Sequence, residues 1–429
     1  MFAVSGLAAG AIAATRAGLA APAVSAPTAP VAVAKVASYT EDLVGHFEKM
    51  FDQIGGLGNQ VRGKTVGIKI NGVGGAGFDG LSAGQTTAVH PNLVTALVVV
   101  LGKNGAKRVR ILESSGREGA LLEDRLLQGG WDINAIKTAA PIVEFEDTNG
   151  MGQGKQYATL KVKYKPYVFP AFMLNHSYAD CDFFISAAKL KNHEEMGLTL
   201  SMKNLFGTTP TLLYGQGTPP QGAIVGADGD WSPNARERVF HYGQAQSPSG
   251  APQEINPKSP RYEGWRLPRV LVDLSGARTI DLAVIDGIQT IVGGENRSIP
   301  GTKPANPGLL VVGRNCVCTD TVACALMGYN PRGGRDEPPW RVFKGGHGRP
   351  ANQYHPPDFY RQYADNIMLL AEAAGMGSAD LSKIEVRGTQ IKDAVFEYDA
   401  VWKGQLTPGG EKPTSQGGGR GRGGDTKKS

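Results

Sequence analysis

The chain has 429 residues, of which 41% are hydrophobic and 20% are charged, and these proportions are typical of a globular protein with a sizeable core. Its formal net charge is +6, but +3 of this lies in the last 21 residues and +2 in residues 1–38, so the body from 39 to 408 carries only +1. This distribution argues against a general nucleic-acid-binding surface, and we expect no specific nucleic-acid partner.

The N-terminal residues 1–38 predict an export signal. Residues 2–14 form an apolar stretch that is too short to span a bilayer as an ordinary helix, and small residues suited to cleavage follow at 21–23. No basic segment precedes the apolar stretch, which a twin-arginine signal with its arginines upstream of Met1 would explain. A disordered Ala-rich extension is the alternative. The sequence therefore predicts a periplasmic or secreted protein with no transmembrane span in its mature chain.

Residues 39–400 are predicted to form one α/β domain that opens with a βαβ unit. The first predicted elements are a helix at 40–54, a strand at 65–70, a helix at 91–104 that begins at Pro91, and a strand at 108–113. A strand, a helix and a strand in this order predict a parallel strand pair.

The remainder of the domain continues this pattern around one long irregular segment. Further helices are predicted at 118–128, 267–277, 318–327 and 359–374, and further strands at 142–146, 182–187, 280–285, 309–313 and 383–388, with a short strand pair within 159–169. Residues 208–262 hold many Gly and Pro with little periodicity and are interpreted as an insertion. Residues 401–429 form a Gly/Arg-rich tail predicted to be disordered. The expected fold class is α/β, with a layered, mostly parallel sheet, flanking helices and Rossmann-like units.

Polar side chains follow the predicted strands. In an open parallel sheet, ligands bind outside the carboxyl ends of the strands, because the connecting loops converge there. The residues in these positions are Asn71, Glu113, Lys189, Lys191, Asp286 and Arg314. We therefore expect them to share one edge of the sheet and, together with Asn204, to bind a ligand.

The segment 189–207 is the densest polar cluster. Within 19 residues it holds three lysines, one histidine, two glutamates and two asparagines. Gathering several ammonium groups at a partly buried place is costly unless anions accompany them, which predicts a small anionic ligand. Lys203 and His193 are the candidate catalytic residues, since imidazole titrates near neutral pH and serves as a general base or a metal ligand. The alternative is that the lysines pair with acidic neighbours such as Glu195 and Asp286 on an exposed loop.

The four cysteines do not form a recognisable metal motif. Cys316, Cys318 and Cys324 lie among apolar and small residues, and Cys181 is far away in sequence. Their spacing is not that of a zinc ribbon or a ferredoxin. Buried structural thiols are predicted, and a metal or disulfide role is the alternative.

Several segments of the chain resemble one known family. They are 68–71 (IKIN), 90–115, 179–207, 284–288 (VIDGI) and 308–331, and the most specific motifs are K-x-K-x-H at 189–193 and K-N-L-F-G at 203–207. Together they resemble the domain of unknown function family 362 over residues 64–388, interrupted by the insertion. Some members of that family carry cysteine-rich ferredoxin segments, which this chain lacks, so no iron–sulfur cluster is expected. The resemblance implies no reaction, and the cofactor stays unknown.

A weaker likeness links the chain to the nickel-pincer lactate racemase group. Asp180, His193 and Lys203 would be the corresponding residues, while the second catalytic histidine of that group has no convincing counterpart. This likeness concerns the fold more than the chemistry.

Three functions are compatible with the sequence, so whether the protein is an enzyme stays open. An exported enzyme would bind a small anion through Lys189, Lys191 and Lys203 and transfer protons through His193. A non-catalytic protein would hold an anion or a metal ion with the same residues. An interaction protein would use the insertion 208–262 and the basic tail. The metal content and the oligomeric state stay open as well.

Overall fold

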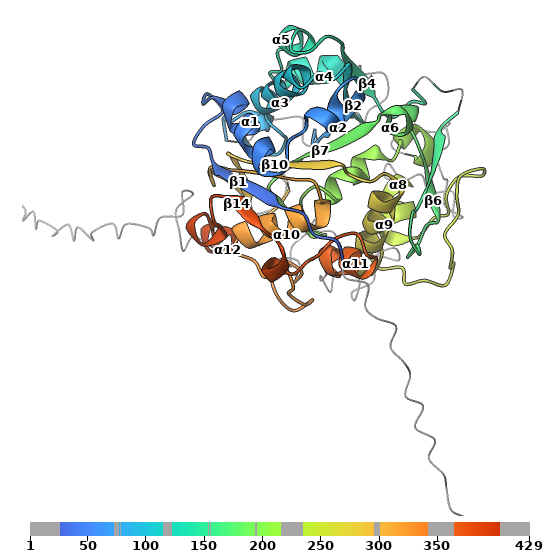
Figure 1. The fold of residues 1–429 in the computed structure, drawn as a ribbon. Helices are drawn as coiled ribbons and strands as arrows, with labels where there is room; N and C mark the ends of the chain where they lie inside the picture. The colour runs from blue at the N-terminus through green and yellow to red at the C-terminus, as the bar shows by residue number, and fades with distance from the viewer. Residues whose placement is uncertain are drawn as a thin grey trace, which may run out of the picture.

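The computed structural model describes residues 26–72, 77, 79–114, 122–152, 154, 156–193, 195–215, 235–295, 301–341 and 364–403. Its centre is an eight-stranded sheet with the strand order β14-β1-β13-β10-β7-β2-β3-β4 (Figure 1). These strands are β1 (Val31–Lys35), β2 (Thr65–Ile70), β3 (Arg108–Glu113), β4 (Val143–Asp147), β7 (Phe183–Lys189), β10 (Leu282–Gly287), β13 (Leu309–Gly313) and β14 (Val386–Gly388). All neighbouring pairs are parallel except the two that involve β13. The expected α/β fold with a mostly parallel sheet is confirmed.

Helices cover both faces of this sheet. Figure 1 shows α1, α3, α4 and α5 on one side of the strands and α9, α10 and α11 on the other. The helices include α1 (Leu43–Gln53), α2 (Gly58–Val61), α3 (Pro91–Lys103), α4 (Leu122–Gln128), α5 (Ile133–Lys137), α6 (His176–Asp180), α7 (Thr211–Tyr214), α8 (Ala235–Glu237), α9 (Glu263–Ala277), α10 (Cys316–Leu326), α11 (Ile367–Ala373) and α12 (Tyr398–Trp402). Because both faces are covered, every residue of the central strand β7 is buried, and its sequence is largely apolar rather than alternating.

The predicted βαβ unit is present as β2, α3 and β3, and β2 pairs with β3 in parallel. The helix α3 begins where the sequence predicts, because Pro91 occupies its first turn and the His90 side chain accepts a hydrogen bond from the backbone N–H of Asn92. One face of α3 packs against α1, and the buried apolar residues of both helices belong to the hydrophobic cluster on that side of the sheet.

Three two-stranded sheets lie outside the central sheet. They are β5 (Ala158–Lys161) with β6 (Ala171–Leu174), β8 (Lys191–His193) with β9 (Gly197–Thr199), and β11 (Thr290–Val292) with β12 (Lys303–Ala305), all antiparallel. The second half of the K-x-K-x-H motif, Lys191–His193, forms β8, whereas Lys189 is the last residue of β7. The pair of β8 and β9 therefore determines where His193 lies relative to Lys189.

The domain boundary expected at residue 38 is wrong, because β1 lies inside the central sheet. Residues 31–35 pair with β13 on one side and β14 on the other, and Val31, Ala32 and Val33 are buried. An Ala/Val-rich composition is compatible with a targeting segment and with a buried strand, so the composition of this stretch did not distinguish the two. The rest of the predicted export signal, residues 1–25, and the tail from 404 onward lie outside the described residues.

The described part of the predicted insertion belongs to the domain core. It includes α7 and a π-helical turn, Arg238–Tyr242, in which Val239 and Phe240 are completely buried. The ring of Phe240 contacts Phe169 and Tyr214. Removing 208–262 would therefore remove core side chains as well as a surface segment.

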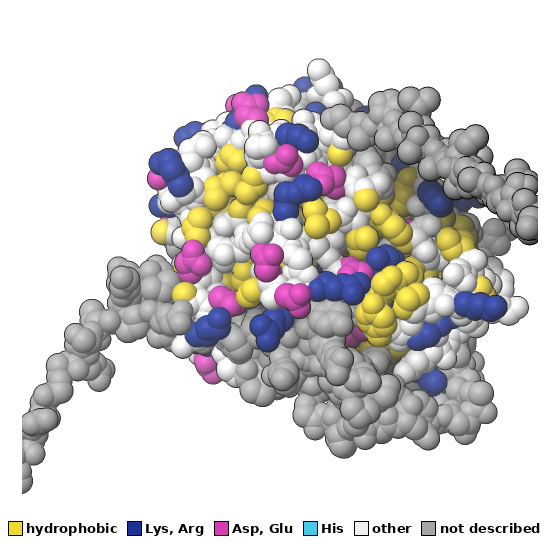
Figure 2. Space-filling model, turned by 90° about the horizontal axis from the view of Figure 1, so that it is seen from below, with side chains coloured by type: hydrophobic (Ala, Val, Ile, Leu, Met, Phe, Trp, Pro, Cys, Tyr) yellow, Lys and Arg dark blue, Asp and Glu magenta, His cyan; other side chains and the backbone are white. Residues whose placement is uncertain are grey.

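The surface agrees with the small net charge of the body. Figure 2 shows one face of the molecule, on which Lys and Arg side chains are interspersed with Asp and Glu side chains. Within the described ranges, no helix combines the length and the apolar composition that crossing a membrane requires.

Candidate functional site

The carboxyl ends of four parallel strands lie at one edge of the sheet. β2 and β10 flank β7 and run parallel to it, and β3 runs parallel to β2. Asn71, Glu113, Lys189 and Asp286 therefore share the edge that the sequence predicted for them. β1 runs in the same direction, since it is antiparallel to β13 and β13 is antiparallel to β10, and this brings Tyr39 to the same edge.

Lys189 is completely buried and has three hydrogen-bond partners. Its Nζ lies 3.0 Å from Asp286 Oδ2, 3.0 Å from the Tyr39 hydroxyl and 2.6 Å from the Gly84 carbonyl oxygen. The Tyr39 hydroxyl donates to Asp286 Oδ1 at 2.8 Å, and the backbone N–H of His90 donates to Oδ2 at 3.0 Å. Burial lowers the pKa of Lys189, and the Asp286 carboxylate opposes that shift. All three ammonium hydrogens are engaged, so Lys189 has none left for a ligand.

A second buried ion pair joins β2 to β3. Lys69 Nζ lies 2.9 Å from the Glu113 carboxylate and donates to the Ile70 carbonyl oxygen at 2.6 Å and to Asn204 Oδ1 at 3.4 Å. Glu113 also accepts the backbone N–H of Gly72 at 2.7 Å. Burial lowers the pKa of Lys69, with Glu113 opposing the shift. This pair is almost as deeply buried as that of Lys189 and Asp286.

Asn204 connects the second ion pair to β7. Its Nδ2 donates to Ser186 Oγ at 3.1 Å and to the Ala187 carbonyl oxygen at 3.3 Å, and its Oδ1 accepts from Asn71 Nδ2 at 3.2 Å. Asn71 Oδ1 is buried and has no hydrogen-bond partner in the part of the chain that the structure describes. We call the following set the inner cluster: Tyr39, Lys69, Glu113, Lys189, Asn204 and Asp286.

His193 ends the short strand β8 and pairs with Glu295. Its Nε2 lies 2.5 Å from Glu295 Oε2, and its Nδ1 accepts the backbone N–H of Glu195 at 3.2 Å. Burial lowers the pKa of His193 to about 4, an effect that Glu295 opposes and the Lys203 ammonium strengthens. The ring is therefore neutral near pH 7, and the hydrogen bonds place its one proton on Nε2, facing Glu295.

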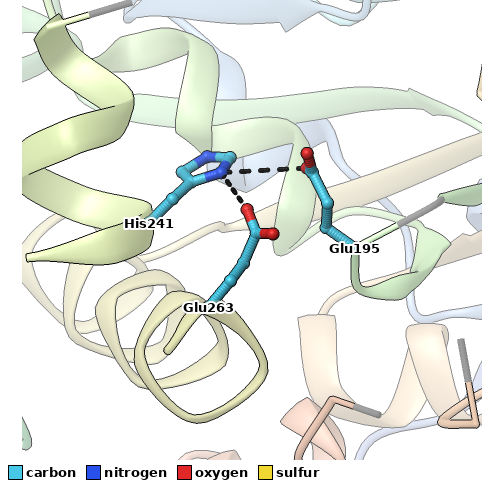
Figure 3. Close-up of side chains that lie close together, drawn as sticks. All are labelled: Glu195, His241 and Glu263. Atoms are coloured by element: carbon cyan, nitrogen blue, oxygen red, sulfur yellow. Dashed lines mark hydrogen bonds and ion pairs between the residues drawn. The ribbon is translucent and has the colours of Figure 1, made fainter. Parts of the chain in front are cut away.

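His241 lies between two carboxylates that come from other parts of the chain (Figure 3). Its Nδ1 is 2.5 Å from Glu263 Oε1, at the start of α9, and 3.7 Å from Glu195 Oε2. The same Glu195 oxygen is 3.8 Å from Nδ1 of His193. Burial lowers the pKa of His241 to about 3, so this ring is neutral as well and donates its Nδ1–H to Glu263. Its Nε2 is buried and has no hydrogen-bond partner among the described residues.

Lys203 begins the 3₁₀ turn Lys203–Thr208 and is only partly exposed. Burial lowers its pKa, although the carboxylates of Glu295 and Glu195 oppose the shift. Its Nζ lies 5.1 Å from the centroid of the Phe206 ring, and the Arg236 guanidinium lies 4.6 Å from the same centroid. Within the described residues Lys203 forms no hydrogen bond and no ion pair. We call the following set the outer cluster: His193, Glu195, Lys203, His241, Glu263 and Glu295.

Lys191 lies beside the outer cluster but is held by main-chain carbonyl groups. Its Nζ donates to the Thr87 carbonyl oxygen at 2.7 Å and to that of Glu295 at 3.3 Å. Burial lowers its pKa to about 8, with Glu295 opposing the shift. Lys191 thus anchors the loop that carries Glu295, and in this way it positions the partner of His193.

The family model named Domain of unknown function (DUF362) matches residues 66–325, which is more than half of the chain. The chain belongs to this family. The DUF362 match covers the whole outer cluster and all of the inner cluster except Tyr39. A comparison with curated proteins yields no match. A crystal structure of a protein from Thermotoga maritima, a Northeast Structural Genomics Consortium target, is similar at 14% sequence identity with a TM-score of 0.27, and the match covers 40% of this chain and 38% of that chain.

Arg314 does not join the other predicted residues of the DUF362 site. β13 is antiparallel to β10, with Gly313 opposite Ala283 and Leu309 opposite Gly287, so Arg314 follows β13 at the other edge of the sheet. The expectation that it reaches the common edge is wrong. An apolar run predicts that a strand is buried, but the direction of the strand depends on its connections and neighbours.

The three residues that correspond to the nickel-pincer group do not meet either. Asp180 is exposed on α6, before β7 begins, whereas His193 and Lys203 follow the carboxyl end of β7. The strand separates Asp180 from the other two residues. The described structure therefore offers no shared site for this set.

The Lys189–Asp286 pair and the four cysteines are both buried. Lys189 does pair with Asp286, as one alternative held, but the pair is buried and not on an exposed loop. The four cysteines are buried and free, as predicted, and burial raises the pKa of the Cys181 thiol.

Five residues of the two clusters were not predicted from the sequence. Some of them have a sequence pattern that could have identified them, and others have none. They are Tyr39, Lys69, His241, Glu263 and Glu295. Lys69 had a usable signal, because a lysine inside the apolar strand 65–70 requires a buried acidic partner. His241 and Glu263 lie in or next to the irregular segment 208–262, where no periodicity indicates which side chains point inward.

Proposed function

We propose that this DUF362 protein binds a small anionic ligand, a carboxylate or a phosphate, beside Lys203. The observation that carries the proposal is the contrast among the lysines. Lys189 and Lys69 pair with buried carboxylates and Lys191 donates to carbonyl oxygens, whereas Lys203 has neither a hydrogen bond nor an ion pair within the described residues. A partly buried ammonium without such a partner gains most from an incoming anion.

Arg236 supports the same ligand chemistry. It shares the Phe206 ring with Lys203. Burial is the main cause that lowers the pKa of Lys203, and the Arg236 charge adds to that shift. An anion bound between the two would offset their repulsion. Arg236 donates to the Thr209 carbonyl oxygen at 3.0 Å, which fixes one arm of its guanidinium. The remaining N–H groups of a guanidinium suit the planar oxygens of a carboxylate or phosphate.

Conversion of the ligand is a second candidate, and the His193–Glu295 pair favours it. A neutral imidazole that a carboxylate orients is the arrangement used for proton transfer, with Glu295 fixing the tautomer. In this scheme Lys203 binds the charge of the substrate, and His193 exchanges a proton with it. Binding without conversion requires only the cations.

Ligand-induced stabilisation tests the binding proposal. A library of small carboxylates and phosphates should contain compounds that raise the melting temperature of the full chain, and at one hundred times Kd the stabilisation is about 2.7 kcal/mol. Lys203→Ala should abolish this response. The matched control is Lys103→Ala, which removes an exposed lysine that pairs with Glu48. An undiminished response in Lys203→Ala contradicts the proposal.

Product analysis of the stabilising compounds then separates binding from conversion. If the protein is an enzyme, mass spectrometry detects a changed compound with the wild type, and His193→Gln loses turnover while keeping the ligand-induced stabilisation. If every compound is recovered unchanged, the protein is a binding protein.

Export is part of the proposed function. The apolar stretch 2–14 and the small residues at 21–23 support a cleaved signal, and β1 begins only at Val31, so cleavage there leaves the sheet intact. Cell fractionation with N-terminal sequencing tests this proposal. A mature N-terminus between residues 22 and 30 in the exported fraction supports it, and an uncleaved chain confined to the cytoplasm contradicts it.

A further inference from the structure

We propose that Glu195, His241 and Glu263 form a binding site for a divalent transition-metal ion. The three side chains come from the β8–β9 connection, the π-helical turn Arg238–Tyr242 and the first turn of α9, and they converge on one point (Figure 3). One potential ligand atom from each lies within 4.8 Å of the others. The sites of the proposed metal ion and the proposed anion are adjacent, but the metal site rests on its own three residues.

The distances suit an ion at the centre of the three groups. With bonds of about 2.1 Å to nitrogen and oxygen, two ligand atoms of one ion lie about 3.0 to 3.4 Å apart. The distances from His241 Nδ1 are 2.5 Å to Glu263 Oε1 and 3.7 Å to Glu195 Oε2. An outward movement of Glu263 and a small inward movement of Glu195, each less than about 1 Å, would reach coordination geometry. Both carboxylates are partly exposed, which leaves them room to move.

The position of the His241 ring is suited to a metal ion. The ring is buried, its Nδ1 faces both carboxylates, and an imidazole nitrogen is a common metal ligand. Its Nδ1 lies 2.5 Å from Glu263 Oε1, and Nε2 has no hydrogen-bond partner among the described residues. When Nδ1 binds an ion, Nε2 carries the ring proton.

The neighbouring carboxylates also favour a cation. Glu195, Glu263 and Glu295 bring three carboxylates to the two imidazole rings, and these carboxylates outnumber the ammonium groups of Lys191 and Lys203 that act on Glu295. A divalent ion would neutralise two of these carboxylates. With less negative charge beside it, Lys203 would attract an external anion more strongly.

The His193–Glu295 pair helps to hold the ligand Glu195 in position. His193 accepts the backbone N–H of Glu195 through Nδ1 and is itself oriented by Glu295, so it holds the loop on which the Glu195 carboxylate lies. Such outer hydrogen bonds fix the positions of ligating side chains in metal sites. His193 is thus a positioning residue for the metal site.

The donor set indicates which ions fit. One imidazole nitrogen with two carboxylate oxygens suits Zn²⁺, Fe²⁺ or Mn²⁺, whereas Mg²⁺ and Ca²⁺ prefer oxygen ligands alone. Three protein ligands also leave at least one coordination position open, as in catalytic metal sites. A small anion bound by Lys203 and Arg236 is suited to fill it.

Metal binding by the full chain tests the inference directly. The protein is freed of metal with EDTA, dialysed against Zn²⁺ in the absence of organic ligands, and analysed by mass spectrometry. We expect one Zn²⁺ per chain, and a Co²⁺-loaded sample should show the visible absorption of a nitrogen- and oxygen-ligated ion. Glu195→Gln, Glu263→Gln and His241→Phe should each weaken binding at least about tenfold. His241→Phe keeps a ring against Phe206, and circular dichroism shows whether each variant is folded.

The matched control is another pair of the same chemistry. Glu41 and His46 lie 3.0 Å apart at the start of α1, on the surface, and Glu41→Gln or His46→Gln should leave zinc binding unchanged. The inference is overturned if the wild type binds less than half an equivalent of Zn²⁺, or if folded Glu195→Gln and Glu263→Gln bind Zn²⁺ as tightly as the wild type. If a variant does not fold, the stoichiometry and the Co²⁺ spectrum of the wild type decide.

A further variant separates this inference from the proposed function. Lys203→Ala removes no metal ligand, so its zinc affinity should stay within about threefold of the wild type while its response to anions is lost. Anion-induced stabilisation without zinc binding overturns the metal site alone. Zinc binding without any response to anions overturns the proposed function alone.

Discussion

The inner and outer clusters both combine lysine with carboxylate side chains, but they differ in how their polar atoms are partnered. In the inner cluster, Lys189 and Asp286 are completely buried, and each has several hydrogen-bond partners. In the outer cluster, Lys203 has neither a hydrogen bond nor an ion pair within the described residues, and His241 has a nitrogen without a partner there. Both clusters follow the same end of the same sheet.

This difference separates structural charges from functional ones. A buried ion pair whose hydrogen bonds are all satisfied holds strands together and has no capacity left for a ligand. A partly exposed charge without a partner costs stability unless something binds to it. Proximity to the carboxyl ends of the strands therefore locates the region, and hydrogen-bond satisfaction distinguishes the residues within it.

The sharpest way to test the comparison is to remove Lys189. Lys189→Ala leaves the Asp286 carboxylate uncompensated in the core, and we expect a loss of about 3–5 kcal/mol in the free energy of unfolding. Urea denaturation of wild type and variant measures the difference. A loss below about 1 kcal/mol would mean that this pair behaves like an exposed one, and the distinction between the clusters would fail.

The pH dependence of stability tests the outer cluster. The change in the free energy of unfolding expected for one pH unit is smaller than the loss expected for Lys189→Ala. His193 and His241 have pKa values lowered by burial to about 4 and about 3, against 6.5 for a free histidine. As the pH falls, the two histidines become protonated in the unfolded chain before they do so in the folded chain. Their contribution to the free energy of unfolding is therefore fully present above pH 6.5 and is lost as the pH drops toward 4. Each histidine contributes a slope of about 1.4 kcal/mol per pH unit in that window.

The contribution of each histidine is obtained by difference. Asp273 and Asp320, whose pKa values burial raises to about 6, act in the opposite direction between about pH 4 and 6, and comparing His241→Phe or His193→Gln with the wild type cancels them. Metal-free urea denaturation at several pH values gives the slopes. Each variant should lose the slope of one proton, and slopes equal to that of the wild type would show that folding does not lower the pKa of the histidines.

The smallest effect on stability is expected for Lys203. Because Lys203 has no hydrogen bond or ion pair to lose within the described residues, Lys203→Ala should change the free energy of unfolding by less than about 1 kcal/mol. The same urea experiment measures this change beside Lys189→Ala. A loss as large as that for Lys189 would assign Lys203 a structural role and remove the basis for the anion site.

The sequence by itself determined whether most elements are helices or strands, and it determined which polar residues lie at one edge of the sheet. Short runs rich in Val, Ile and Phe at 65–70, 108–113 and 182–187 predicted strands of a parallel sheet. The polar residues at the strand ends, among them Asn71, Glu113, Lys189 and Asp286, do lie at a common edge. These predictions succeeded because periodicity and strand-end position are local properties of the chain.

Only the tertiary structure decided strand direction, partnership and the membership of the outer cluster. β13 reverses and takes Arg314 away, and β1 joins the sheet from a segment whose composition also suits a signal. His241 and Glu263 meet Glu195 because the π-helical turn and α9 pack beside β8, across a separation in sequence that no local pattern records. Hydrogen-bond satisfaction is likewise a property of the folded chain, since the partners of Lys189 come from three distant segments.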